Sequence, residues 1–194
     1  MRARGHWLAV VLMLLTAAGC GNNGPSSEPV QTPPEIAPTI APLGPRPQTL
    51  PLDNIDPCAL LTSSQVNALH VRRGRPGVDN DGLGSRDCLW SNSPDEPDLG
   101  WVARATLRRG AEQYRNDSTE VVHIGGFPAV QASSEIQDPE THCLLMIDVA
   151  PGQSLWVQFV NMGRTYPGMN HQRACQFARQ TAEDMLTNLR GLAR

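Results

Sequence analysis

The sequence contains no lysine, so all of its cationic side chains other than histidine are arginines. With Arg2 and Arg4 set aside as part of an expected signal segment, 14 arginines face 19 acidic residues, a net charge of −5. Nucleic-acid binding depends on neutralising phosphates, and the chain has no basic stripe for that purpose. The composition therefore argues against a nucleic-acid partner. The missing lysine indicates a GC-rich genome, such as that of a high-GC Gram-positive bacterium.

Familiar catalytic signatures are missing too. The chain has no GxSxG nucleophile elbow, no HExxH zinc motif and no glycine-rich phosphate loop. It has no CxxC pair, and the i, i+4 spacing of His171 and Cys175 alone does not indicate a metal site. We expect no enzymatic activity, no cofactor and no metal. The alternative is an enzyme that uses Asp95, Glu96 and Asp98, although their segment SNSPDEPDLG is more typical of a solvated turn.

The most apolar run of the chain lies near its start, from Trp7 to Ala18. It is shorter than the roughly 20 residues of a membrane-spanning helix, but it suits a signal-peptide core of about 7–15 residues. Ala17-Ala18-Gly19-Cys20 then resembles the lipobox of bacterial lipoproteins, although leucine is more usual at Ala17. We predict that residues 1–19 are a signal peptide and that lipidated Cys20 anchors the protein on the extracellular face of the cytoplasmic membrane. The alternative is ordinary secretory cleavage.

Residues 20–52 follow as a proline-rich segment. Between Gly21 and Pro51 the chain has nine prolines, few charges and no aromatic residue. Such a segment buries too little apolar surface to offset its ordering entropy, so we expect a disordered linker. In a polyproline II conformation it could reach roughly 90 Å from the membrane.

Residues 53–194 have the length of one compact domain. They contain Cys58, Cys88, Cys143 and Cys175, and an even number of cysteines in an exported chain indicates two disulfides. Three pairings are possible. We favour Cys58–Cys175 and Cys88–Cys143, because each pair then joins two helices or two strands.

Hydrophobic patterns in this domain predict helices at both ends and strands between them. Asp56-Pro57 and the capping-box spacing of Thr62 and Gln65 predict a short N-terminal helical region, and Asn170–Arg190 predicts a long C-terminal helix, ended by Gly191. We expect an α+β fold, an antiparallel sheet of about six strands with the N- and C-terminal helices packed on one face. The predicted strands are residues 86–90, 101–108, 120–124, 127–132, 143–149 and 154–160.

Two features of the domain are candidates for ligand binding. Residues 72–86, RRGRPGVDNDGLGSR, form a long glycine-rich loop, in which Arg72, Arg73 and Arg75 are the densest basic group of the chain. Trp156 alternates with apolar neighbours, so it points to the opposite sheet face from them. There it is either covered by another element or exposed as a contact residue.

Several short motifs together resemble one family, the actinobacterial lipoproteins grouped as domain of unknown function 3558. The resemblance spans roughly residues 53–190 and implies a cell-envelope lipoprotein of actinobacteria. It carries over no catalytic residue. The motifs are Asp56-Pro57-Cys58-Ala59-Leu60-Leu61-Thr62, Cys88-Leu89-Trp90, Gly125-Gly126-Phe127-Pro128-Ala129, the strand that opens with Cys143, and Cys175 with Ala178 and Ala182 in the last helix.

The expected function is that of a non-enzymatic envelope module that binds a partner protein, a cell-wall glycan or a lipid. One alternative is a wall-polymer-modifying enzyme, which a deep polar pocket gathering Asp, Glu or His would favour. Another is an accessory subunit of an exporter or a sensor.

Overall fold

The computed structural model describes residues 42–77, 82–92, 98–133, 141–161 and 166–193. The predicted signal peptide, Cys20 and the linker as far as residue 41 lie outside these ranges, as do Asp95 and Glu96. Among the described residues, no helix is both long enough and apolar enough to cross a membrane.

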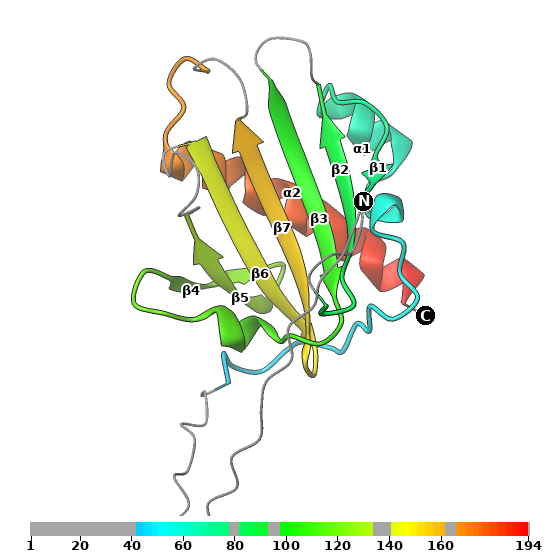
Figure 1. The fold of residues 1–194 in the computed structure, drawn as a ribbon, viewed down its shortest axis with the longest axis vertical. Helices are drawn as coiled ribbons and strands as arrows, with labels where there is room; N and C mark the ends of the chain where they lie inside the picture. The colour runs from blue at the N-terminus through cyan, green and yellow to red at the C-terminus, as the bar shows by residue number, and fades with distance from the viewer. Residues whose placement is uncertain (1–41, 78–81, 93–97, 134–140, 162–165, 194) are drawn as a thin grey trace, which may run out of the picture. The chain divides into compact units, whose positions relative to one another are not determined.

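Seven strands form one antiparallel sheet in the order β1-β2-β3-β7-β6-β5-β4 (Figure 1). All six predicted strands are present within a few residues of their expected bounds. The seventh, β1, lies in the segment predicted as a loop, and its two residues are too few to show a periodic pattern. The strands are β1 (Arg75–Pro76), β2 (Arg86–Ser91), β3 (Leu99–Thr106), β4 (Glu120–Ile124), β5 (Phe127–Ala132), β6 (His142–Ala150) and β7 (Gln153–Asn161).

Two strand connections have the turn chemistry that the sequence indicates. Gly125 and Gly126 join β4 to β5, with φ angles of 54° and 87°. Two successive positive φ values are typical of a type I′ turn, whose twist matches that of the flanking strands. Gly152, between β6 and β7, has a φ of 68°, a positive value that glycine adopts without steric cost.

The C-terminal helix α2 (His171–Leu192) crosses one face of the sheet (Figure 1). Asn170 caps its start, because the side-chain oxygen accepts a hydrogen bond from the N–H of Arg173. The helix runs past Gly191, so the prediction that this glycine ends it is wrong. The predicted apolar stripe of α2 is fully buried against the sheet: Ala174, Ala178, Ala182, Met185 and Leu189.

The N-terminal helical region is less extensive than the fold prediction requires. It consists of the 3₁₀ turn η1 (Pro57–Leu60) and the six-residue helix α1 (Ser63–Ala68). Both predicted caps are present, since Asp56 caps η1 and the side chains of Thr62 and Gln65 form a capping box at α1. However, α1 has no buried residue. The prediction of an N-terminal helix packed on the sheet is therefore not confirmed.

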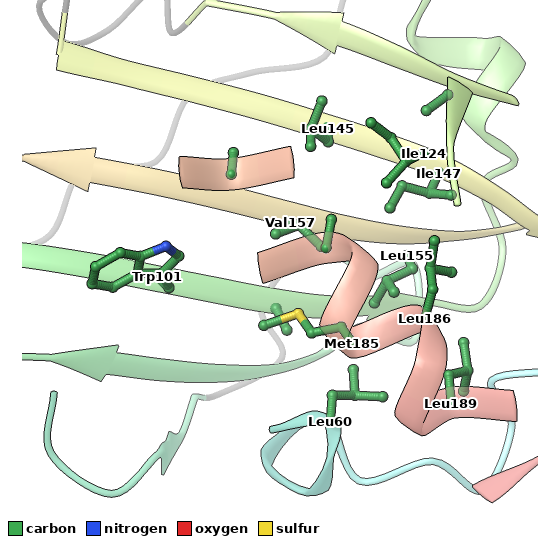
Figure 2. Packing of buried hydrophobic residues seen from close by; sticks show 14 of the residues in the cluster. Leu60, Trp101, Ile124, Leu145, Ile147, Leu155, Val157, Met185, Leu186 and Leu189 are labelled. Carbon is green, nitrogen blue, oxygen red and sulfur yellow. The ribbon is translucent and has the colours of Figure 1, made fainter. Parts of the chain in front are cut away.

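One apolar core fills the space between α2 and the sheet, and Figure 2 shows part of it. Met185 and Leu186 of α2 face Val157 and Leu155 of β7 (Figure 2), and all four side chains are fully buried. Burying a leucine or methionine side chain stabilises a protein by about 1.5–3 kcal/mol. The core therefore fixes α2 on one face of the sheet.

The folded domain begins before residue 53. Leu50 and Leu52, which fall in the predicted disordered linker, are 4% and 0% exposed. The N–H of Leu50 donates to the carbonyl of Val149 at 2.8 Å, and that of Leu52 donates to the side chain of Gln153 at 2.8 Å. The prediction of a disordered linker is wrong for this stretch. Its composition is proline-rich, but Leu50 and Leu52 pack into the core.

The disulfides are Cys58–Cys88 and Cys143–Cys175, so the favoured pairing is wrong. Each bridge joins a helical segment to a strand, with Cα–Cα distances of 5.1 Å and 4.9 Å. The strand order explains the error. Since β3 and β7 lie between β2 and β6, Cys88 and Cys143 are three strand spacings apart, about 14 Å. A disulfide spans at most about 7 Å between Cα atoms.

Candidate functional site

The sheet face opposite α2, which we call the open face, is turned toward the viewer in Figure 1. Four side chains cross its middle as successive register partners on β2, β3, β7 and β6: Leu89, Val102, Gln158 and Leu144. We call them the central row. All four are half-buried, and three are apolar, whereas the solvated face of an antiparallel sheet is ordinarily polar.

Trp156 lies beside the central row, two residues from Gln158 on β7, and it is covered. The ring of Tyr114, from the 3₁₀ turn η2 (Ala111–Tyr114), meets the indole edge-on with ring centroids 5.7 Å apart. The guanidinium of Arg104 lies 5.2 Å from the centre of the indole ring and forms a two-pronged ion pair with Asp87 at 2.8 Å and 2.9 Å. Of the two predicted alternatives for Trp156, the structure shows the covered one.

The three arginines of the predicted basic group lie at different positions on the surface. Arg75 in β1 pairs with the first residue of the central row, so it extends that row on the open face. Arg73 lines a concavity beside α1. Arg72 is exposed, and its N–H donates to a carbonyl of β2. Arg75 and Trp156 are three strand spacings apart, about 14 Å, so the two predicted binding features share one face without contact.

A buried carboxylate, Asp148 on β6, was not singled out by the sequence. It is 5% exposed and forms an ion pair with Arg46, which precedes it by 102 residues. Burial raises the pKa of Asp148, while the hydrogen bond and the charge of Arg46 lower it and Glu112 raises it. No local pattern relates residues so far apart, so this pair could not be found before the fold was known.

We expect Asp148→Asn to flatten the pH dependence of stability. Because the pKa of Asp148 is raised in the folded state, its contribution to stability is fully present below the unfolded value of 3.8 and is lost as the pH rises through the folded value. Removing the titrating group removes that loss. Denaturant unfolding at about pH 4 and about pH 7 measures the effect. The same pH difference in the variant and the wild type would contradict the prediction.

Two concavities stand out on the described part of the chain. One of about 530 Å³ lies beside the first half of α2, with a polar lining that includes Gln172, Gln176 and Gln180. The other, of about 440 Å³, lies between α1 and β2 and has a mostly apolar floor. Neither has an Asp, Glu or His among the described residues of its lining. Within the described ranges, no three His, Cys, Asp or Glu side chains gather as a metal site requires.

A family model described as "Protein of unknown function (DUF3558)" matches residues 15–188. The chain belongs to this family. The DUF3558 match covers the sheet, both disulfides and most of α2, and it agrees with the resemblance of the sequence. Comparisons with curated proteins and with solved structures each gave no match. Family membership assigns no activity, so the surfaces of the domain carry the functional argument.

Proposed function

We propose that this DUF3558 protein is a membrane-anchored lipoprotein of the actinobacterial cell envelope that binds a protein partner on the open face of its sheet. The lipobox-like Ala17-Ala18-Gly19-Cys20 supports the anchor, and the lysine-free composition supports the source. Lipid on Cys20 would hold the domain at the extracellular face of the cytoplasmic membrane. The role is binding rather than catalysis.

The central row carries the proposal for a protein partner. Its apolar members Leu89, Val102 and Leu144 are half-buried on a face that faces away from α2, whereas the neighbouring side chains on the α2 face are fully buried. Protein interfaces have such an apolar centre, and arginine is enriched in them. Arg75 is exposed and extends the central row at one end. An apolar row of this kind favours a protein surface over a hydrated glycan.

The position of the folded boundary limits where the partner can lie. Leu43 packs against the small cluster that contains Trp156, so the chain joins the domain at the open face. Residues 21–42 then connect the proposed lipid anchor to the domain. In polyproline II conformation these residues reach roughly 70 Å, less than the 90 Å expected when the linker was taken to residue 52. A partner on the open face would therefore be another protein at or near the same membrane.

Site-specific photo-crosslinking in the native host tests the proposal. A benzoylphenylalanine placed at Val102 should give one adduct of defined mass, and the same probe at Gln180 on the exposed side of α2 should not. Leu89→Glu, which puts a charge in the central row, should reduce the Val102 adduct at least fivefold while the melting temperature is retained.

Anchoring is tested in the same cells with Cys20→Ala. This variant should no longer partition with membranes after processing, and the Val102 adduct should fall with it. Equal adducts from Val102 and Gln180, or an adduct that Leu89→Glu leaves unchanged, would rule out the open face as the interface. Full membrane retention of a cleaved Cys20→Ala chain would rule out the lipid anchor.

A further inference from the structure

The concavity beside α1 has the size of a small-molecule site and a lining that combines an apolar floor with polar walls. Its volume of about 440 Å³ lies within the roughly 300–1,000 Å³ typical of such sites. Its floor is apolar and well packed, since Trp90, Leu61 and Val71 are 1%, 5% and 9% exposed. Val66 of α1 lines the wall and is only half-buried. An apolar group bound here would remove more of the Val66 side chain from water.

Among the residues that the structure describes, the rim of the concavity carries charge of one sign. Arg73 is exposed and lines it, together with the neutral side chains of Ser63 and Asn67, and none of the described lining residues is acidic. A carboxylate at the mouth would meet a guanidinium and no carboxylate of the lining. A cationic ligand would meet only repulsion from the same group.

The wall of the concavity is held in place before any ligand binds. The Cys58–Cys88 disulfide closes a loop of the chain that contains every lining residue except Trp90. Trp90 follows Cys88 by two positions. At Gly74 a Cβ atom would lie 2.5 Å from the Cys88 sulfur and 2.6 Å from the indole nitrogen of Trp90, so the backbone rests directly on both groups. A wall fixed in this way loses little conformational entropy on binding, which favours affinity.

We propose that this pocket binds a small amphiphilic carboxylate, with a short acyl or aryl body against Trp90 and Val66 and the carboxylate toward Arg73. The apolar floor selects the body of the ligand, and the single guanidinium selects the sign of its charge. The pocket contains none of the central-row residues. The proposal of a carboxylate ligand is therefore independent of the proposal of a protein partner.

Calorimetric titration with octanoate tests the pocket, and 1-octanol serves as the uncharged match. The chain from Gly21 onward retains the whole compact unit Pro38–Arg194 and avoids detergent. Octanoate should bind at one site per chain. Arg73→Gln should weaken octanoate binding about threefold to fivefold and leave 1-octanol binding unchanged, as expected for an exposed charge pair. Arg72→Gln, the neighbouring arginine outside the lining, should change neither.

Val66→Glu places a carboxylate in the wall and should weaken both ligands more than tenfold. Ala68→Glu, on the same helix but outside the lining, is its control. Val66 is half-buried and packs against the core, whereas Ala68 is exposed, so binding of each variant is compared at a temperature at which circular dichroism shows the fold of the parent chain. The absence of saturable one-to-one octanoate binding would overturn the proposal. Octanoate binding that survives Val66→Glu in a folded chain would overturn it as well.

Discussion

A chain that begins at Asp53 is expected to unfold with a free energy at least about 4 kcal/mol lower than a chain that begins at Pro42. The shorter chain lacks Leu50 and Leu52, which are nearly or fully buried. Removing a buried leucine side chain costs about 2–5 kcal/mol, so two of them set the lower bound. The shorter chain also lacks Arg46, which leaves the Asp148 carboxylate buried without its ion pair. Urea unfolding followed by circular dichroism measures the difference.

The longer chain with Leu52→Ala provides a matched test if the shorter chain does not fold at all. It retains Arg46 and should lose about 2–5 kcal/mol by itself. Equal unfolding midpoints for the chains that begin at residues 42 and 53 would show that the segment contributes nothing. In that case the boundary predicted from composition would be the correct one.

Removing the Cys143–Cys175 bridge with paired alanine substitutions is expected to lower the free energy of unfolding by about 4 kcal/mol. The bridge closes a loop with a sequence separation of 32, and a loop of that size has a closure entropy worth about 4 kcal/mol. It also joins the second turn of α2 to the start of β6, and its cysteines are 0% and 5% exposed. Thermal and denaturant unfolding of the variant measure the loss.

The Cys58–Cys88 bridge is the natural control, because its sequence separation of 30 gives nearly the same closure entropy. The two bridges differ in how accessible their sulfur atoms are to a reducing thiol. Cys58 is half-buried and lines the concavity beside α1, so an attacking thiolate can reach its sulfur. Under dithiothreitol, mass spectrometry of trapped thiols should show Cys58–Cys88 reduced first. Earlier reduction of Cys143–Cys175 would contradict this account of access.

Local chemistry made most of the secondary structure predictable. The capping box of Thr62 and Gln65 and the Gly125-Gly126 turn depend on residues next to one another, and both are present. Alternation of apolar and polar residues predicted β3, and it too is present. The strand β1 had no such signal, because a two-residue strand exists only through its pairing with β2. The helix α2 includes Gly191 and ends one residue later, at Leu192, a difference within the one or two residues by which helix ends vary.

Contacts between distant residues could not be predicted in this way. The disulfide pairing follows from the strand order, which no single segment encodes. The ion pair of Arg46 with Asp148 joins residues 102 positions apart. Tyr114 and Arg104, on two other elements, cover Trp156. Alternation along β7 therefore predicted the sheet face on which Trp156 lies, but not the residues that cover it. Arg73 was predicted as a binding residue, but the apolar floor beside it became visible only in the folded chain.

The central position of β7 has a consequence for how the chain folds. β7 is the last strand in the sequence, yet it is the one that joins β3 to β6, and its pairing of Leu99 with Asn161 spans 62 residues. Until β7 is present, β1–β3 and β4–β6 share no edge, and pairings of such long sequence separation form slowly. A nascent chain that ends before Asn161 therefore lacks the contacts that make the sheet continuous. The sheet therefore remains divided into two separate parts until the last of its strands has been synthesised.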